Sequence, residues 1–303
     1  MNDLCSIAIS NCSLYSFADD TALLFSGPTW EGTLVSAQSG FNLVGNWLRH
    51  NKLTLNVSKT KFITHSLRES TQPDEYDATI LAHSCQAQNL ADCNCPKIER
   101  VKELKYLGII IDRSLSFKPH INLLVNRIRK LIFVFKSLRS IVEPTLLKST
   151  YYSLCQCLIT YCITSWGGVC KSHLIFVERA QRAVLKVATF KKFRFPTDQL
   201  YAFCQVLTVR QLFIYHAILR QHQLTFYNPI VAKKQNRIVC AGVARQKNFS
   251  VHQFYFLGAF LYNKLNRILN LYVLNSHQIK GTLLSWLQPL NYDRTEEFLV
   301  PSS

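Results

Sequence analysis

Residues 13–25 decide the fold of the N-terminal part of this chain, and they read Ser-Leu-Tyr-Ser-Phe-Ala-Asp-Asp-Thr-Ala-Leu-Leu-Phe. Two adjacent carboxylates, Asp19 and Asp20, lie between two runs rich in apolar and aromatic residues. Aspartate is a poor strand former and a good turn former, because its side chain binds nearby backbone N–H groups. The pattern therefore predicts a β-hairpin with both aspartates at its tip. A surface turn with no further role would also explain an isolated Asp-Asp pair.

The chain carries a large excess of positive charge. Among its 303 residues, 35 are Lys or Arg and 18 are Asp or Glu, so the formal net charge is +17. Nineteen of these cations and five of the anions lie between residues 97 and 194. The content of 48% hydrophobic and 12% aromatic residues is typical of a folded globule. The charge favours polyanionic partners such as nucleic acid, although a basic protein at a membrane surface would show the same sign.

No membrane span and no secretory signal are expected from the sequence. The N-terminus is polar, and no run reaches the roughly 18 apolar residues that a membrane span needs. The closest run, residues 154–170, is interrupted by polar residues and is followed by Lys171. We therefore predict an intracellular protein of the nucleus or cytoplasm that is not secreted and has no membrane partner.

The eleven cysteines favour reduced thiols over disulfides. Most of them lie in apolar helical runs, where free cysteine behaves as a small hydrophobic residue. Cys85, Cys93 and Cys95, with His83 nearby, form the one group that suggests a metal site. Their spacing matches no paired zinc-knuckle pattern, and no histidine pair completes it. The interpretation is therefore a set of reduced thiols rather than structural zinc.

The first 115 residues are predicted to form a small α/β region. Residues 30–50 have the spacing of an amphipathic helix, and residues 53–57 alternate like an edge strand. A turn leads to a second strand at residues 61–65. Within residues 98–112, an alternating strand leads through Tyr-Leu-Gly into a β-branched strand. Gly108 inside this pattern indicates a bulge or a close backbone approach.

From residue 116 onward the apolar spacing becomes helical. We predict a helical bundle over residues 116–224 and a tail module over residues 225–303 that opens with a basic loop. The expected helices are 121–138, 144–168, 173–189 and 197–222, the last with a break near 207–209, and 254–265 and 276–287 in the tail. The predicted fold class is therefore α+β, with an N-terminal region of 1–115 followed by mainly helical regions.

Taken in order, these features resemble the reverse transcriptases of non-LTR retrotransposons, the jockey-like elements in particular. Residues 17–20, Phe-Ala-Asp-Asp, are similar to the aromatic-Ala-Asp-Asp motif of the polymerase palm. Asn56, Lys59 and Thr60 are similar to the next palm motif. Residues 106–108, Tyr-Leu-Gly, are similar to the primer-grip motif. His120 fits the usual start of the helical thumb-like region. Further matches are Tyr151, Trp166-Gly167, residues 178–182, Leu185 and the tail segment 245–287, whose usual motif is degraded at 261–266.

The resemblance implies an RNA-directed DNA polymerase that transfers nucleotides with two Mg²⁺ ions. Asp19 would be a metal ligand, and Asp20 would support the site or bind the metal more weakly. Lys59 would meet the triphosphate, with a solvated turn lysine as the alternative. The primer-grip residues would be Tyr106, Leu107 and Gly108. The implied partners are an RNA template, a DNA primer and the RNA of the element, with no small-molecule ligand other than a dNTP.

Seven basic side chains of the helical region are candidates for contact with the template–primer phosphates. They are Arg127, Arg129, Lys130, Lys136, Arg139, Arg179 and Arg182. Such contacts give salt-dependent binding without sequence readout. Solvated helix faces are the alternative for part of this set.

The family pattern also includes an upstream metal-binding aspartate, which Asp3, the one earlier carboxylate, does not resemble. We therefore expect the C-terminal half of a palm, then a thumb-like bundle and a tail, with no polymerase activity of its own. Two alternatives remain open. The chain could be a non-catalytic basic RNA- or DNA-binding remnant of a retrotransposon, or a product without a stable fold.

Overall fold

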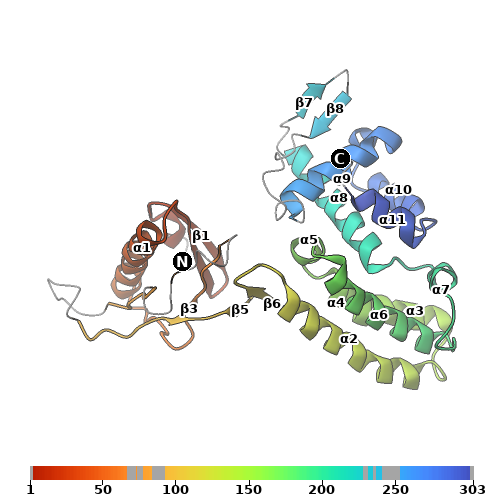
Figure 1. Ribbon diagram of the computed structural model, residues 1–303, viewed down its shortest axis with the longest axis horizontal. Coiled ribbons are helices and arrows are strands. Elements are labelled where there is room, and N and C mark those ends of the chain that lie inside the picture. The colour runs from red at the N-terminus through yellow and green to blue at the C-terminus, as the bar shows by residue number, and fades with distance from the viewer. Residues whose placement is uncertain are drawn as a thin grey trace. The chain divides into compact units, whose positions relative to one another are not determined.

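The computed structural model describes residues 3–66, 73, 78–83, 93–227, 231–234, 237–240 and 253–300. The chain divides into two compact units, an N-terminal unit of Met1–Ser116 and a C-terminal unit of Phe117–Ser303 (Figure 1). The predicted α+β class is confirmed, because short strand pairs form much of the first unit and helices form most of the second.

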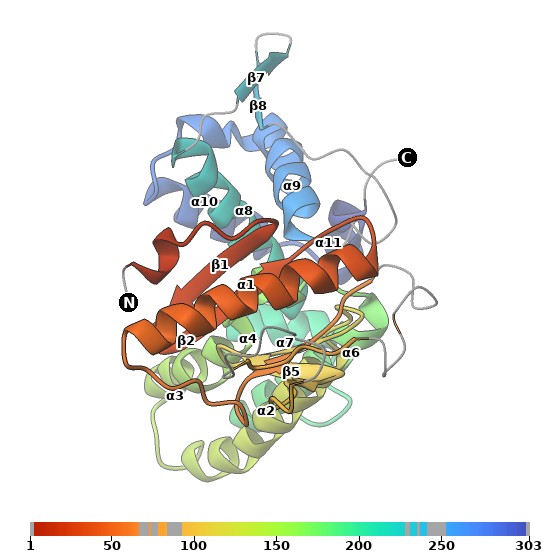
Figure 2. The ribbon, with the colours of Figure 1, turned by 90° about the vertical axis from the view of Figure 1, so that its left-hand side faces the viewer.

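The N-terminal unit is built on a hairpin and one long helix. After a short 3-10 turn, η1 (Leu4–Ser6), strand β1 (Cys12–Phe17) pairs antiparallel with β2 (Asp20–Phe25). Helix α1 (Trp30–His50) lies alongside this hairpin (Figure 2). Thr29 caps the helix, since its Oγ1 accepts a hydrogen bond from Gly32 N at 3.3 Å. The helix has the bounds that the sequence predicts.

Two short strand pairs complete the N-terminal unit. Strand β3 (Lys61–Phe62) pairs parallel with β4 (Glu99–Arg100), and β5 (Glu103–Tyr106) pairs antiparallel with β6 (Ile109–Asp112). The core of the unit contains the buried residues Ala37, Ile80, Ala82 and Ile98, against which Phe25, Phe41, Leu55, Val57 and Phe62 pack.

The predicted edge strand at residues 53–57 is wrong. Residues 53–56 belong to no strand, and a turn begins at Val57. The apolar alternation arises because Leu55 and Val57 both pack against the core. The Asn56 side chain then turns the backbone by accepting hydrogen bonds from Ser58 Oγ at 2.8 Å and Lys59 N at 3.1 Å. The strand predicted at 61–65 is reduced to the two residues of β3.

Gly108, for which the sequence predicts a bulge or a close backbone approach, lies in a tight turn and not in a bulge. Tyr106 pairs with Ile109, which leaves Leu107 and Gly108 as the two residues that connect β5 and β6. Both have positive φ angles, 45° at Leu107 and 84° at Gly108. A two-residue hairpin with φ above zero at both positions favours glycine, because most side chains are strained there.

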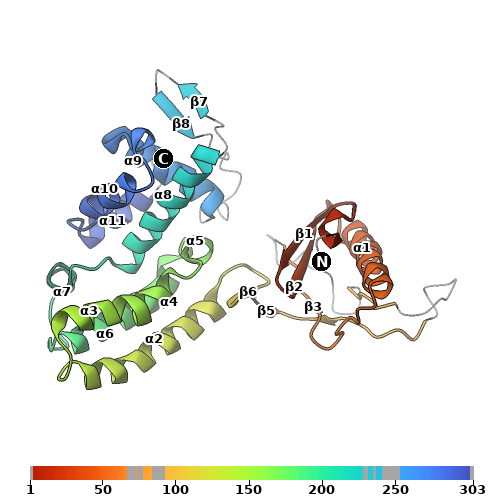
Figure 3. The ribbon, with the colours of Figure 1, turned by 180° about the vertical axis from the view of Figure 1, so that it is seen from behind.

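The C-terminal unit contains two groups of helices. In the first, α2 (Lys118–Leu138) packs along α6 (Lys171–Ala188), and α7 (Thr197–Cys204) follows (Figure 3). In the second, α8 (Val209–Tyr227) packs against α9 (Phe254–Leu269), α10 (Gln278–Leu287) and α11 (Tyr292–Leu299). The smaller elements are β7 (Val231–Lys234), β8 (Arg237–Cys240) and η6 (Leu271–Val273).

Helix α11 was not predicted. The predicted break near 207–209 is confirmed by the separation of α7 from α8. Arg245 and Lys247 of the predicted basic loop lie outside the described residues.

The predicted continuous helix over residues 144–168 is wrong. It divides into α3 (Pro144–Tyr151), the π-helical segment η4 (Tyr152–Gln156), α4 (Cys157–Thr160) and α5 (Ile163–Trp166). Cys162 has a φ of 49°, which ends the helical path after Thr160. Trp166 is fully buried, and its Nε1 donates to Tyr161 O at 2.9 Å. The burial of this indole therefore stabilises a turn that periodicity alone does not reveal.

No single helix in the described ranges is long and apolar enough to cross a membrane. The pair α7 and α8, bent by 53°, would pass such a test together by length and composition.

His120 makes the stability of the C-terminal unit depend on pH. It is 7% exposed, its ring lies 5.7 Å from that of Trp166, and its Nδ1 has no hydrogen-bond partner in the described structure. Burial, and secondarily the charge of Arg127, lowers the pKa of His120 to about 4. The unfolded chain takes up the proton near its ordinary pKa of about 6.5, whereas the folded chain resists it until about 4. The contribution of neutral His120 to the free energy of unfolding is therefore fully present above pH 6.5 and is lost as the pH falls toward 4.

We expect the free energy of unfolding to fall by about 1–2 kcal/mol through this residue alone between pH 7 and pH 5. Denaturant unfolding at both pH values, in the native chain and in His120→Gln, measures this difference. The same pH dependence in both proteins would contradict the assignment. His216 is the control, because burial also lowers its pKa; His216→Gln should leave the His120 contribution in place.

Candidate active site and nucleic-acid interface

The aspartates lie where the sequence places them, at the tip of the β1–β2 hairpin. Phe17 pairs with Asp20, so Ala18 and Asp19 form the turn, and Ala18 has a φ of 51°. Both aspartates are exposed. Neither carboxylate makes a hydrogen bond or an ion pair with any residue that the structure describes. The tip therefore presents two carboxylates to solvent.

One face of the hairpin is open. Residues directly opposite each other in an antiparallel pair share a face, and side chains alternate along each strand. The register consequently places Asp20 on the same face as Tyr15, Phe17 and Leu24. These three apolar side chains are 54%, 64% and 54% exposed. Phe25 lies on the opposite face and packs against the core. The open face thus combines a carboxylate with two aromatic rings at the surface.

The aspartate pair has the donor chemistry that Mg²⁺ prefers. This ion is commonly bound through one or two carboxylates and completes its coordination with water and substrate phosphates. Within the described residues, no third His, Cys, Asp or Glu ligand groups with Asp19 and Asp20. The residues present therefore fit one Mg²⁺ that takes its remaining ligands from water or a bound substrate.

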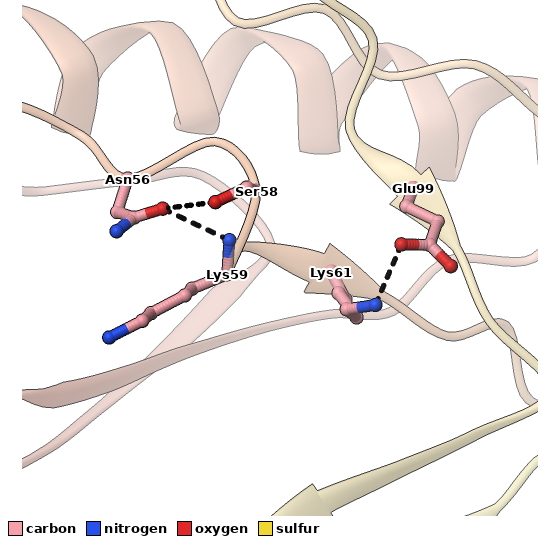
Figure 4. Close-up of polar contacts among 5 residues, drawn as sticks. All are labelled: Asn56, Ser58, Lys59, Lys61 and Glu99. Carbon is pink, nitrogen blue, oxygen red and sulfur yellow. Dashed lines mark hydrogen bonds and ion pairs between the residues drawn. The ribbon is translucent and has the colours of Figure 1, made fainter.

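Lys59 lies in the turn that Asn56 organises. Besides the two side-chain bonds already described, Asn56 O accepts from Lys59 N at 3.2 Å and from Thr60 Oγ1 at 2.8 Å. Figure 4 shows the Lys59 side chain extending away from this turn, while the neighbouring Lys61 reaches Glu99 across β3 and β4 at 2.7 Å. Lys59 is exposed, and its ammonium has no partner among the described groups. The turn therefore holds the backbone of Lys59 and leaves its charge in solvent.

The aspartate pair, Lys59 and the Tyr-Leu-Gly turn all lie in the N-terminal unit. Tyr106, Leu107 and Gly108 form the β5–β6 turn and are half-buried. Among the described residues, no hydrogen bond or ion pair joins this turn to the aspartates or to Lys59.

Sequence reasoning missed Asp112 at the end of β6. It is buried, and its Oδ2 accepts from Ser114 Oγ at 2.6 Å, Ser116 N at 3.1 Å and Ser116 Oγ at 2.9 Å. Its role is to hold the turn after β6.

The predicted basic residues divide into exposed and engaged groups. Arg127, Arg129, Lys130 and Lys136 on α2 and Arg179 on α6 are exposed. Arg139 is engaged instead, because its Nη1 donates to Val187 O at 2.9 Å and its guanidinium lies 4.3 Å from the Phe190 ring centroid. Arg182 is half-buried, and its Nη1 lies 3.3 Å from Thr197 Oγ1. These two arginines hold helices to their neighbours, so the first five are the better candidates for phosphate contact.

A basic–aromatic surface after α6 was missed in the sequence. Residues 190–195 read Phe-Lys-Lys-Phe-Arg-Phe. Phe193 is 91% exposed and Phe190 is 63% exposed. The ammonium of Lys191 lies 4.2 Å from the ring centroid of Phe203, which is itself 61% exposed. Exposed rings interleaved with cations suit the stacking of unpaired bases beside a phosphate backbone. The sequence signal was the alternation of Phe with Lys and Arg.

Comparison with known proteins identifies two relatives. The probable RNA-directed DNA polymerase from transposon X-element of Drosophila melanogaster is 22% identical over 179 residues, which is 58% of this chain. The probable RNA-directed DNA polymerase from transposon BS of the same species is 26% identical over 181 residues, or 56% of this chain.

The chain is related to retrotransposon reverse transcriptases. The matched segment spans 18% of the length of each relative. No protein-family model matches the chain. No solved structure matches it either. The relationship accords with the palm-like order of motifs in the N-terminal unit and with the helical character of the C-terminal unit.

Proposed function

We propose that the chain is part of the RNA-directed DNA polymerase of a jockey-like non-LTR retrotransposon and that it acts inside the cell on RNA templates and DNA primers. The observation that supports this most directly is the open hairpin tip. Asp19 and Asp20 are exposed and unengaged within the described structure, beside the surface rings of Tyr15 and Phe17. An unengaged carboxylate pair is what a metal-dependent phosphoryl transfer requires.

In this proposal Asp19 and Asp20 would hold Mg²⁺, and the bound metal would supply charge stabilisation for the attacking and leaving oxygens. Lys59 provides a positive charge for the triphosphate, since its ammonium extends into solvent from a fixed turn. Leu107 and Gly108 hold a primer end through the backbone of the β5–β6 turn. The exposed cations Arg127, Arg129, Lys130, Lys136 and Arg179 bind phosphates without reading sequence.

We also propose that the 303-residue chain alone does not extend a primer. A two-metal site uses carboxylates that bridge both ions, and the described residues supply no third ligand to the Asp19–Asp20 pair. This observation also favours the second candidate function, a non-catalytic nucleic-acid-binding remnant in which the basic helices are the working part.

A binding titration and an extension assay together test the proposal. The purified chain is titrated against a fluorescent RNA template–DNA primer hybrid at several salt concentrations. We expect Arg127→Ala/Arg129→Ala/Lys130→Ala to reduce the slope of log K against log salt by about 2, because each phosphate contact contributes roughly 0.7–0.9. The matched control, Arg267→Ala/Lys280→Ala/Arg294→Ala, removes three exposed cations from the tail helices and should change the slope by less than about 1. Equal slopes in the two variants would contradict the assigned surface.

The extension assay adds Mg²⁺ and dNTPs to the same complex. No product is expected from the native chain, and Asp19→Asn should keep the native affinity for the hybrid. Magnesium-dependent extension that Asp19→Asn abolishes would overturn the proposed inactivity and support the catalytic assignment of the pair. Loss of binding in Asp19→Asn would contradict both.

A further inference from the structure

We propose that His83, Cys93 and Cys95 bind a structural Zn²⁺ ion in the N-terminal unit. The donor atoms of these three side chains all lie within 4.8 Å of one another. Cys93 Sγ and His83 Nδ1 are separated by 3.2 Å. This is the one such group of three or more potential ligands in the ranges that the structure describes. The site is separate from the proposed polymerase function and does not depend on it.

Two segments of the backbone bring the ligands together. Leu81 and Lys97 form an isolated antiparallel bridge. Ala82 N donates to Pro96 O at 2.9 Å, and Ile98 N donates to Ile80 O at 2.8 Å. Ala82 is therefore opposite Pro96. If this antiparallel register continues by one more residue, His83 is opposite Cys95. Cys93 lies two residues before Cys95, so an extended chain presents both thiols to the same side. The backbone pairing therefore brings His83 close to Cys95 in the fold, and the Cys93 thiol reaches His83 through its side chain.

The pairing is anchored in the core of the unit. Ile80, Ala82 and Ile98 are 8%, 8% and 5% exposed, and they pack together with Ala37 of α1. The side chains of the three ligands are half-buried. A metal-binding group on a buried framework is held near its bound geometry before the ion arrives, which reduces the entropy cost of binding.

The donor set selects zinc among common cellular metals. Two thiolates and one imidazole are soft and borderline ligands, which suit Zn²⁺ and not Mg²⁺ or Ca²⁺. With Zn–S near 2.3 Å and Zn–N near 2.0–2.1 Å, tetrahedral ligand atoms lie about 3.4–3.8 Å apart. The 3.2 Å between Cys93 Sγ and His83 Nδ1 is slightly shorter than this range, and the other ligand atoms lie no more than 4.8 Å apart. Three protein ligands leave the fourth position for water or another donor. Cys85, grouped with these residues in the sequence, lies outside the described residues and is not assigned to the site.

Zinc binding is expected to connect two segments of the chain. The ion would join residues 78–83 to residues 93–100, and β4 begins at Glu99 within the second of these segments. Metal binding to ligands that the unfolded chain does not preorganise adds directly to folding free energy. The metal would therefore stabilise the strands that lead into the β5–β6 turn.

The test uses the full 303-residue chain, prepared metal-free under reducing conditions and then given ZnCl₂ or CoCl₂. After removal of excess metal, about one zinc per chain is expected by elemental analysis. Cobalt should show the intense visible bands of a tetrahedral thiolate complex. Cys93→Ser/Cys95→Ser should lose these bands and bind zinc more than about tenfold more weakly. The control Cys5→Ser/Cys157→Ser removes two exposed thiols and should behave as the native chain.

A second measurement needs no variant, and it applies even where the double substitution prevents folding. The native chain is alkylated with and without zinc, and each cysteine is quantified by mass spectrometry. Zinc should slow the labelling of Cys93 and Cys95 at least about tenfold and leave Cys5 and Cys157 unchanged. Equal labelling of Cys93 and Cys95 in both conditions, or cobalt spectra without thiolate bands, would overturn the proposal and leave a metal-free thiol–imidazole contact.

Discussion

Gly167→Ala should destabilise the C-terminal unit by about 3 kcal/mol. Gly167 follows α5, and a Cβ at this position would lie 2.5 Å from Phe213 Cδ2, 2.6 Å from Ile163 O and 2.9 Å from Ile163 Cγ1. The Phe213 ring belongs to α8 and is 1% exposed, so it has no room to withdraw. Ile163 O accepts the hydrogen bond of Gly167 N at 2.7 Å, so it cannot move without breaking that bond. The methyl group therefore has to displace backbone or separate α5 from α8.

Gly281→Ala is the matched control in the same unit. Gly281 lies within α10, and apart from its chain neighbours and the backbone of its own helix, no described atom lies within 4 Å of a Cβ at that position. Alanine should stabilise this helix by about 0.5–1 kcal/mol, because it restricts the unfolded chain and has the higher helix propensity. Urea unfolding followed by far-ultraviolet circular dichroism measures both changes. Two substitutions with effects of the same sign would show that the close approach of α5 and α8 is not as described.

Gln181→Leu should destabilise the same unit by about 3 kcal/mol. Gln181 on α6 is 0% exposed, and its amide group is fully used. Its Nε2 donates to Tyr151 Oη at 2.8 Å and to Leu207 O at 2.9 Å, while its Oε1 accepts from Tyr201 Oη at 2.8 Å. One side chain thus ties α6 to α3, to α7 and to the connection that precedes α8.

Leucine at position 181 would leave these partners unsatisfied. Burial raises the pKa of Tyr151 and Tyr201 well above their ordinary value, so both hydroxyls keep their protons. Tyr201 Oη would lose its acceptor, while Tyr151 Oη and Leu207 O would each lose a donor. A buried polar group without a partner costs about 1–3 kcal/mol. The control Gln199→Leu makes the same chemical change at an exposed position of α7 and should shift stability by no more than about 0.5 kcal/mol. Thermal unfolding measures both changes. If both variants have the same Tm as the native chain, the buried network is contradicted.

Gln181 also shows what a family motif leaves unexplained. In the sequence, residues 178–182 contribute to the resemblance, and Arg179 and Arg182 are assigned to phosphates. The structure leaves Arg179 exposed, directs Arg182 toward Thr197 and buries Gln181 among tyrosines. A linear motif does not separate side chains that bind a partner from those that hold helices together, because both kinds alternate on a single helix.

Features with local causes could be predicted from the amino-acid sequence alone. Apolar spacing, the Thr29 cap and the cationic end are sufficient for α1, because helical hydrogen bonds lie within four residues of each other. The turn preference of aspartate between two apolar runs was sufficient to locate the hairpin tip at Asp19 and Asp20. The order of such motifs was also enough to indicate the relationship to retrotransposon reverse transcriptases.

Features that need a distant partner become visible only in the folded chain. Residues 53–57 have the alternation of a strand, but a strand requires hydrogen bonds from a neighbour, and Asn56 turns the chain instead. The helix expected from 144 to 168 breaks at Cys162, which has a φ of 49°, and Trp166 beyond the break is buried with its ring 5.7 Å from that of His120. His83 comes to Cys95 through a backbone bridge that sequence spacing does not encode. For Trp166 and for the group of His83 and Cys95, the contact lies between segments far apart in the sequence, where local propensity carries no information.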